Sequence, residues 1–292
     1  MRVTGNQLID AAQASTSRAQ ESVGRATSQV SSGLRVEKPS DDPAAWLAAH
    51  RAGLRKALMD GSRAAIAASR DRLDQTDEAL SEIGDAVAQV RTLAVQGASA
   101  SYGANDRAEL GLQVRALFQS ALAAANTKTP DGEYLLAGAA SLTEPFDPSG
   151  AYVGDSTTRQ VPTGDEGTAA MAVPGSELTA ARGVDVLPLL DKVATALSTN
   201  DMTALGGFLA QLGTAVQQVS ITRTRAGGTM QVLDATVAAH DVLSEHFAKT
   251  ISDAVEVDTV AAASDLAKAS QALEISRAVS SHIISLLDPS AP

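Results

Sequence analysis

Residues 9–30, near the N-terminus, read IDAAQASTSRAQESVGRATSQV. Apolar or small side chains recur in it at alternating spacings of three and four residues, which is the heptad pattern of a coiled-coil seam. The seam positions are Ile9, Ala12, Thr16, Ala19, Val23, Ala26 and Val30. No proline interrupts the pattern before Pro39, so it predicts a helix of roughly 30 residues. Because one helix cannot cover its own seam, a partner helix is needed.

The C-terminal end carries a matching pattern. Its positions are Val255, Thr259, Ala262, Leu266, Ala269, Leu273, Ser276, Ser280, Ile283 and Leu287. We therefore predict that the two terminal helices pair with each other. The chain between them must then form an elongated hairpin. The alternative for either end is an ordinary amphipathic helix lying on a compact core.

Three further heptad patterns lie between the ends. They cover residues 45–98, 110–124 and 205–237. Asp42 before Pro43 predicts the start of the first of these helices, since the acid can cap it and proline is tolerated at its first position. Asn105 and Asp106 are capping types and predict the start of the second.

Proline and glycine punctuate residues 130–185, so long helices are not expected there. Short strands are predicted around residues 134–136, 151–153, 159–161 and 171–173. The predicted fold is mainly α, an elongated antiparallel helical bundle or coiled coil with paired terminal helices and a small β-rich insertion on the outside. The predicted parts are residues 1–42 with 251–292 as the terminal pair, 43–138 with 185–250 as a long-helix domain, and 139–184 as the β-rich outer domain.

The composition argues against several classes of partner. The 292 residues carry a formal charge of -11, which repels nucleic acid and anionic membrane surfaces. Cysteine is absent, which excludes disulfides and thiolate chemistry. No apolar run is long enough for a membrane span, and the N-terminus lacks the pattern of a cleavable signal peptide. We expect a soluble chain, or one exported by a route that reads no such peptide.

The sequence offers no catalytic, cofactor or metal motif, and we expect a protein that is not an enzyme. Its histidines are His50, His240, His246 and His282, and none form the i, i+4 pair of a shared helical metal site. Phosphate-loop, dinucleotide and nucleophile-elbow motifs are missing. An enzyme whose site is assembled from distant residues is the alternative.

Three stretches resemble the flagellin family, which includes flagellins and flagellar hook-associated proteins. The first is SSGLRV at 31–36 with SDDPA at 40–44, and the third is ISDAVEVD at 251–258 with IISLL at 283–287. The second, NTKTPDGEYLLAG at 126–138 with PF at 145–146 and YVGD at 152–155, is similar to the hook–filament junction type. The family often has Leu-Phe where this chain has Leu135-Leu136. The motif residues carried over are Ser32, Gly33, Arg35, Asp41, Asp42, Pro43, Asp131, Gly132, Tyr134, Gly138 and Asp155.

The resemblance implies a structural subunit of the bacterial flagellum that is extracellular and lacks cofactors. It implies polymerisation through terminal helices that are loose in the monomer and fold on assembly. The implied partners are further copies in a helical or ring assembly, a hook-associated protein on the hook side, flagellin on the filament side, and an export chaperone at the C-terminal helix. Flagellin itself is the alternative, and a coiled-coil scaffold or secretion-apparatus tip protein is a remote one.

Overall fold

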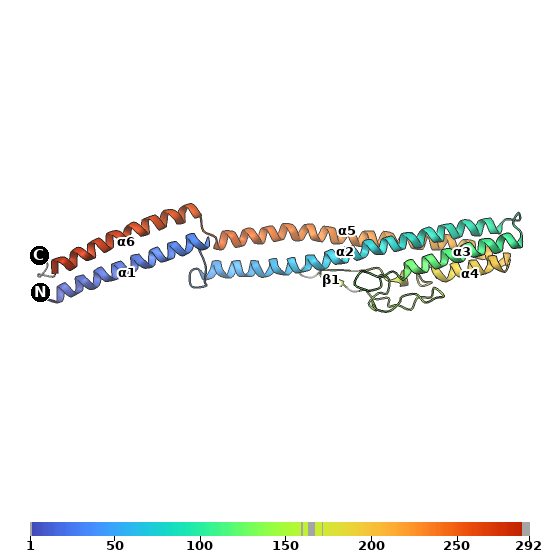
Figure 1. Cartoon of the computed structure of the whole chain (residues 1–292), viewed down its shortest axis with the longest axis horizontal. Coiled ribbons are helices and arrows are strands. Elements are labelled where there is room, and N and C mark those ends of the chain that lie inside the picture. The colour runs from blue at the N-terminus through green and yellow to red at the C-terminus, as the bar shows by residue number, and fades with distance from the viewer. Residues whose placement is uncertain (1, 159, 163–166, 171, 288–292) are drawn as a thin grey trace. The chain divides into compact units, whose positions relative to one another are not determined.

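The structure is a computed structural model that describes residues 2–158, 160–162, 167–170 and 172–287 (Figure 1). Most of the described chain is helical. The elements in order are α1 (Arg2–Ser32), α2 (Pro43–Ala98), α3 (Ala104–Ala125), β1 (Gln160–Pro162), β2 (Thr168–Ala170), the 3₁₀ helix η1 (Gly175–Leu178), α4 (Val186–Ser198), α5 (Met202–Val255) and α6 (Thr259–Leu287). The predicted mainly α class with a small β element is confirmed.

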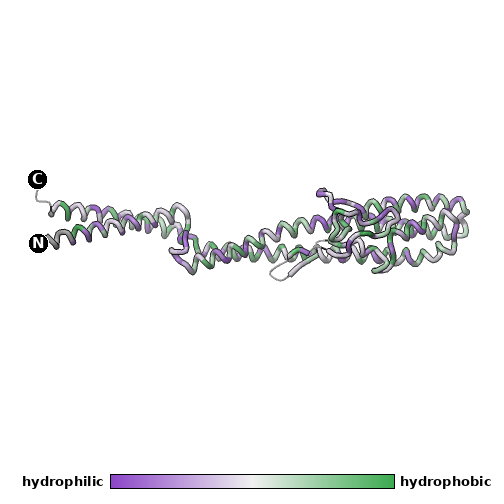
Figure 2. The backbone as a smooth tube through the Cα atoms, turned by 90° about the horizontal axis from the view of Figure 1, so that it is seen from below, coloured by the Kyte–Doolittle hydropathy of each residue, from purple (hydrophilic) through white to green (hydrophobic). Residues whose placement is uncertain are grey.

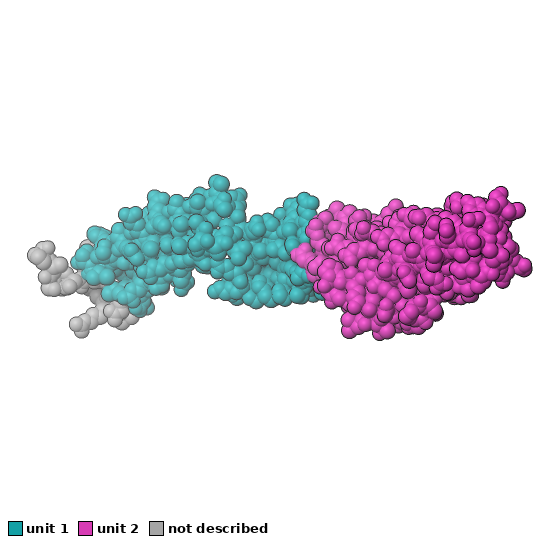
Figure 3. All heavy atoms as spheres, turned by 45° about the vertical axis from the view of Figure 1, so that its right-hand side comes forward, with its two compact units in different colours: residues 1–58, 243–292 teal, residues 59–242 magenta. Residues whose placement is uncertain are grey.

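The chain divides into two compact units (Figure 3). Unit 1 contains residues 1–58 and 243–292, and unit 2 contains residues 59–242. Helices α2 and α5 each contribute residues to both units. The three-part division expected from the sequence uses other boundaries and stays a prediction.

In unit 1, α1 packs against α6, so the predicted pairing of the terminal helices is confirmed. The C-terminal heptad pattern includes Val255, but Val255 is the last residue of α5 and lies outside α6. Helix α6 begins at Thr259, and Asp258 before it accepts hydrogen bonds at Oδ1 from the N–H groups of Val260 (2.9 Å) and Ala261 (3.1 Å). A capping carboxylate of this kind satisfies backbone donors that a helix start leaves free.

Unit 2 is built on the antiparallel packing of α2 against α5. Three ion pairs set their register: Asp77 with Arg223 (2.9 Å), Arg63 with Asp241 (2.7 Å), and Arg70 with Asp234. One hydrophobic core joins these helices to α3 and α4. Its fully buried side chains include Leu80, Ile83, Val87, Val90, Val114, Leu187, Leu190, Val193, Leu197, Leu205 and Leu212.

Two helix starts in unit 2 differ from expectation. Helix α3 begins at Ala104, so Asn105 and Asp106 lie in its first turn and do not precede it. Asp106 still caps the helix, since its Oδ2 accepts from the N–H of Gly103 at 2.8 Å. Helix α4 was not predicted as a separate helix. It is divided from α5 by a turn in which Asn200 adopts a positive φ of 56°, a conformation that asparagine tolerates well.

The segment between α3 and α4 is mostly irregular. Strands β1 and β2 form one antiparallel pair with Val161 opposite Ala169. Tyr134 and Tyr152 make only isolated bridges, and the last strand lies at residues 168–170, before the expected 171–173. Arg159 and Met171, which belonged to the predicted strands, lie outside the described residues.

Two hydrophobic contacts hold this segment within unit 2. Leu135, Leu136, Phe146 and Leu178 are buried in the main core. The β1–β2 pair covers a second cluster on α2 and α5, made of Ile66, Leu73, Val161, Ala169, Val173, Ala226 and Leu233. The segment is thus anchored by its own leucine and phenylalanine side chains, although it contains little regular structure.

Replacing Leu80 by alanine should destabilise unit 2, because this side chain is fully buried in the core. The expected loss is about 2–5 kcal/mol of unfolding free energy, as for other buried leucines. The matched control is Leu112→Ala, since Leu112 is 68% exposed on α3 of the same unit, and should change stability little. Urea unfolding followed by circular dichroism measures both. Equal losses for the two variants would contradict the core described above.

Candidate functional site: the terminal helix pair and its joint

Helices α1 and α6 lie side by side (Figure 1). Each of them has one face that is less exposed than the rest. The predicted seam residues that are partly or fully buried are Ile9, Ala12, Ala19, Val23, Ala26, Leu266, Ala269, Leu273 and Ile283. Val30 departs from the face and is 42% exposed. Leu287 is the last residue of α6, and its side chain lies outside the part of the chain that the structure describes.

The centre of the pair is polar. Thr16 Oγ1 lies 3.1 Å from Ser276 Oγ and 3.0 Å from Ser280 Oγ, and it also donates to the carbonyl oxygen of Ala12. Ser276 Oγ donates in turn to Ser15 Oγ at 3.3 Å. These bonds join residues from opposite ends of the sequence and therefore define one register for the pair. The heptad pattern had identified these positions but not their bonds.

The pair buries few large side chains. Among the seam residues whose side chains the structure describes, the buried ones are the alanines Ala26 and Ala262, at 7% and 4% exposure. A second side of α6 is also apolar, with Ile275 and Val279 more than half exposed at 56% and 51%. Figure 2 shows hydrophobic and hydrophilic positions interleaved along both helices, with neither hydrophobic all round. A single copy thus leaves apolar surface of its terminal helices open to further partners.

A joint of backbone hydrogen bonds connects the two terminal segments below the pair. The N–H of Arg35 donates to the carbonyl oxygen of Val255 at 2.7 Å, and the N–H of Val257 donates to that of Gly33 at 2.9 Å. Gly33 ends α1 with a positive φ of 72°, a conformation that favours glycine. The Arg35 side chain adds a bond from Nη2 to the carbonyl oxygen of Ala254 at 2.7 Å.

Acidic side chains shape the turn from α1 into α2. Hydrogen bonds from the hydroxyls of Ser32 and Ser28 lower the pKa of Glu37. Asp41 Oδ2 accepts from the N–H groups of Glu37 and Lys38, both at 3.1 Å. The six motif residues of this region therefore lie in one connected turn, and each of the acids has a structural partner.

Asp42 caps α2, which begins at Pro43 as the sequence suggests. Its Oδ1 accepts from the N–H of Ala45 at 3.0 Å, and its Oδ2 lies 3.3 Å from Arg35 Nη1. The bond to Ala45, followed by the one to Arg35, lowers the pKa of Asp42. The adjacent pair Asp41 and Asp42 thus serves turn geometry and does not form a catalytic dyad.

The middle motif lies in unit 2 and is held by a buried arginine that sequence reasoning missed. Arg72 of α2 donates to Glu133 Oε2 at 2.9 Å and to the carbonyl oxygen of Tyr134 at 2.5 Å. Gly132 has a positive φ of 84° in the turn, and Asp131 beside it is exposed. Lys128 Nζ lies 4.5 Å from the centre of the Tyr134 ring. The motif therefore builds a loop that is docked on α2.

Gly138 and Asp155 meet at the other end of this loop. Gly138 has a φ of 66°, and a Cβ at this position would lie 1.8 Å from the carbonyl oxygen of Asp155, so only glycine fits. The Tyr152 hydroxyl donates to that same oxygen at 2.6 Å. Asp155 accepts from the Thr157 backbone and hydroxyl, which lowers its pKa. These contacts explain the motif spacing by packing.

The requirements of a metal site and of a membrane-spanning helix are not met among the described residues. No three His, Asp or Glu side chains are grouped there as a metal site would require. His240 is 5% exposed with no hydrogen-bond partner for either nitrogen, whereas His246 is exposed, so the two lie in different surroundings. In the described part of the chain, no helix combines the length and apolar character needed to cross a lipid bilayer.

Comparison with known proteins defines the class first. Residues 3–141 match the model of the bacterial flagellin N-terminal helical region, a match that covers α1, α2, α3 and the middle motif up to Gly138. This part of the chain is similar to the N-terminal helical region of bacterial flagellins. The resemblance read from the motifs is confirmed.

The particular relatives are flagellar hook-associated proteins. The chain is 31% identical over 129 residues to flagellar hook-associated protein 3 of Escherichia coli, covering 43% of this chain and 40% of that protein. It is 30% identical over 138 residues to flagellar hook-associated protein 3 of Salmonella typhimurium, covering 46% and 43%. The matched region is thus about two fifths of the length of these curated relatives.

Solved structures share the fold. A putative flagellar hook-associated protein from Vibrio parahaemolyticus superposes with a TM-score of 0.66 at 21% identity, covering 74% of this chain and 100% of that one. The FlgL protein of Bacillus cereus superposes with a TM-score of 0.57 at 20% identity, covering 71% and 99%. The helical arrangement of this chain is therefore that of flagellar hook-associated proteins.

Removing the hydroxyls from the centre of the terminal pair should strengthen it. In the triple variant Thr16→Val, Ser276→Ala and Ser280→Ala, apolar groups replace the three hydroxyls that meet at the centre of the pair. Ser15, which loses the bond from Ser276, is exposed and can bond to water, and the Ala12 carbonyl oxygen is part of the helix. We expect longer survival of both termini under limited proteolysis and a greater tendency to self-associate. The control variant Thr16→Val removes one hydroxyl and leaves Ser276 and Ser280 without this partner, so its termini should not survive proteolysis longer. Faster proteolysis of the triple variant would contradict a weakening role for the hydroxyls.

Tyr152 should make stability fall at alkaline pH. Burial, followed by the negative charge of Asp155, raises the pKa of Tyr152 from 10.0 to about 12. The folded state therefore favours the neutral phenol, and this stabilisation is complete below pH 10 and lost as the pH rises through about 12. The Tyr152→Phe variant has no phenol to ionise. The difference in unfolding free energy between wild type and variant should therefore shrink as the pH rises from 10.0 to about 12. Urea unfolding at several pH values tests this, and a constant difference would contradict it.

Proposed function

We propose that the chain is a structural axial subunit of the bacterial flagellum, acting as an adaptor at the hook–filament junction and polymerising through its terminal helices. The observation that carries the proposal is the α1–α6 pair: a seam joining the two ends of the chain, with further apolar surface left open. The similarity to proteins named flagellar hook-associated protein 3 supports the junction over the filament.

The weak seam suits a subunit that must stay monomeric until it reaches its place. A two-helix pair with small side chains buries little apolar surface to offset the entropy of ordering. We infer that the terminal helices loosen in the free monomer and become ordered when neighbouring copies cover Ile275 and Val279. The predicted seam and motif residues are proposed as the assembly surface and its joint.

The proposed partners follow from this position. They are further copies of the chain, a hook-associated protein on the hook side, flagellin on the filament side, and an export chaperone that covers the open face of α6 before assembly. The proposed location is extracellular, reached through the flagellar export apparatus. This role requires no catalytic chemistry.

Flagellin is the second candidate, because residues 3–141 match a model of flagellins in general. Deleting the gene separates the two. Loss of an adaptor should leave hooks in place while flagellin escapes into the medium, whereas loss of flagellin leaves no filament protein to escape. Electron microscopy of the cells and immunoblots of the medium distinguish the two outcomes. Filaments still attached to hooks in the deletion strain would contradict both candidate functions.

Truncation tests the role of the ends. Variants lacking residues 1–35 or 258–292 lose one partner of the terminal pair but keep unit 2, whose core lies within residues 59–242. They should be soluble and folded by circular dichroism yet fail to restore motility to the deletion strain. Restored swimming with attached filaments would contradict assembly through the terminal helices.

A further inference from the structure

Asp131 belongs to the middle motif, but the docking of that motif does not use its side chain. Backbone bonds close the turn around it, from the N–H of Thr129 to the carbonyl oxygen of Glu133 at 2.8 Å and from the N–H of Gly132 to that of Thr129 at 2.9 Å. The Asp131 side chain is exposed, and no other described residue forms a hydrogen bond or an ion pair with its carboxylate. The carboxylate is therefore able to move toward the backbone beside it.

An aspartate that precedes glycine can isomerise through a cyclic imide. The backbone nitrogen of Gly132 attacks the side-chain carboxyl carbon of Asp131 and forms a C–N bond, while the N–H proton and the carboxyl hydroxyl leave as water. A second water molecule then opens the ring. When it cleaves the bond between this nitrogen and the original main-chain carbonyl carbon, the backbone continues through the side chain and contains one more methylene group. The product is isoaspartate, which has the same mass as aspartate, and no step needs an oxidant or a cofactor.

The chain contains two Asp–Gly steps, and the fold treats them differently. Asp60–Gly61 lies inside α2, where the N–H of Gly61 belongs to the helical hydrogen-bond ladder, so the helix must open before the nitrogen can approach the carboxyl. Asp131–Gly132 lies in a turn outside the helices and strands. The N–H of Gly132 also forms a hydrogen bond, but a single bond in an exposed turn opens more readily than the interior of a long helix.

Gly132 leaves the attacking nitrogen unobstructed. It has no Cβ to crowd the approach, and its φ of 84° is a conformation that favours glycine. A Cβ built at this position would meet no atom within 4 Å, so neighbouring parts of the fold do not crowd the turn either. The turn therefore has room for the imide ring.

Asp155, which precedes Ser156, shows how hydrogen bonds can prevent the same reaction. Its carboxylate accepts from the N–H of Thr157 at 3.0 Å and from the Thr157 hydroxyl at 2.7 Å, and these bonds lower its pKa. They keep the carboxyl group charged, and a charged carboxylate resists attack by a nitrogen because it has no hydroxyl to lose. Asp131 has no such bonds among the described residues.

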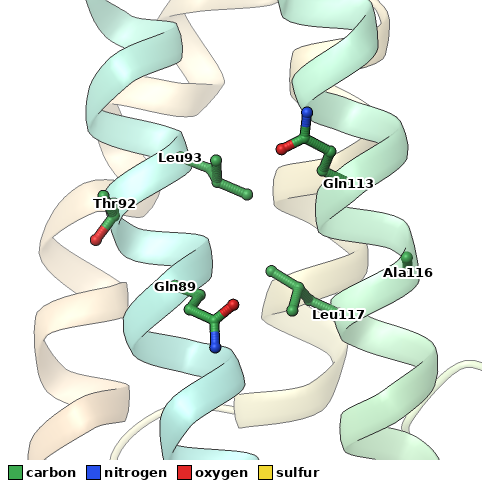
Figure 4. A pocket seen from close by; sticks show the side chains of 6 residues that line it. All are labelled: Gln89, Thr92, Leu93, Gln113, Ala116 and Leu117. Atoms are coloured by element: carbon green, nitrogen blue, oxygen red, sulfur yellow. The ribbon is translucent and has the colours of Figure 1, made fainter.

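Water, which opens the imide ring, reaches Asp131. A hollow of about 290 Å³ lies between α2 and the loop, and it is lined on one side by Asp71, Arg72 and Gln75 and on the other by loop residues that include Asp131. A groove between α2 and α3 has different chemistry, since the side chains that line it include no carboxyl group (Figure 4). Of these two hollows beside α2, the one at Asp131 therefore brings solvent to a carboxyl group that precedes a glycine.

We propose that Asp131–Gly132 is a site of isoaspartate formation in the folded protein, and that the reaction loosens the middle motif from α2. The extra methylene group falls inside the turn that the bond from Thr129 to Glu133 closes. A longer turn shifts Glu133 and Tyr134, which Arg72 holds through bonds of 2.9 Å to Glu133 Oε2 and 2.5 Å to the Tyr134 carbonyl oxygen. The reaction needs this loop alone, so it does not depend on the role proposed for the chain in the flagellum.

Incubation of the purified full-length protein tests where isoaspartate forms. Samples are kept in warm, neutral buffer, digested with trypsin, and analysed by mass spectrometry with electron-transfer fragmentation, which distinguishes isoaspartate from aspartate. Trypsin releases the two Asp–Gly steps in separate peptides, which begin after Lys56 and after Lys128. We expect isoaspartate to accumulate at residue 131 at least about tenfold faster than at residue 60, because a packed helix opens rarely.

The same protein in urea is the matched control, because unfolding removes the helix and the turn alike. The two Asp–Gly steps should then react at similar rates. Similar rates in the folded protein as well would overturn the inference, since the fold would not distinguish the two steps. Folded protein without isoaspartate at residue 131, while the urea sample reacts, would also overturn it.

The variant Asp131→Glu tests the effect on docking. Glutamate keeps the charge at this exposed position, but its longer side chain must close a larger ring, so it should resist isomerisation. Hydrogen–deuterium exchange is measured on fresh and aged samples of both proteins. In the isomerised fraction of aged wild type, the amides of residues 132–136 should exchange severalfold faster than in fresh protein, whereas aged Asp131→Glu should match its fresh sample. Unchanged exchange in isomerised wild type, or equal acceleration in both proteins, would overturn the loosening of the motif.

Discussion

The packing of α1 against α6 along small and hydroxyl side chains distinguishes unit 1 from unit 2. The least exposed seam residues there are alanines, and the central position is a threonine bonded to two serines. Unit 2 is built differently, with leucine, isoleucine and valine fully buried in one core. Since hydrophobic stabilisation scales with buried apolar area, the chain combines a firmly folded unit with a marginal one. An assembling subunit gains from this division, because its binding surface can order last.

The joint keeps the marginal pair in place despite its weak seam. Backbone bonds between Arg35 and Val255, and between Val257 and Gly33, connect the end of α1 with the end of α5. Backbone groups form these bonds whatever side chains occupy the seam. The capped start of α2 at Asp42 and of α6 at Asp258 then sets where each helix begins. The helices can thus have poor packing along their length and still enter the pair from defined points.

The sequence predicted the helices better than the contacts between them. Heptad spacing located the seam from Ile9 to Ala26 because a helix repeats its exposure every three to four residues. Heptad spacing also placed Val255 in the C-terminal seam, although the helices break at residues 256–258. This break depends on helix capping and backbone hydrogen bonds, which the spacing of apolar residues does not reveal. The contacts of Arg72 with the loop at 133–135 could not be predicted, since they join segments about 60 residues apart. The turn at Asn200 left a local signal, an asparagine before an aspartate, that could have separated α4 from α5.

Charge and assembly are linked through the distribution of acids and not through their total. At physiological ionic strength, charges are screened over about 8 Å, so a net charge of -11 acts mainly when two surfaces come close. What matters for contact is therefore which faces carry the acids. On α2 of unit 2 the exposed acids lie on one face, whereas α5 is uncharged from Met202 to Thr222. A chain with this pattern keeps particular faces free of acidic side chains, and these are the faces on which copies of the chain would repel each other least.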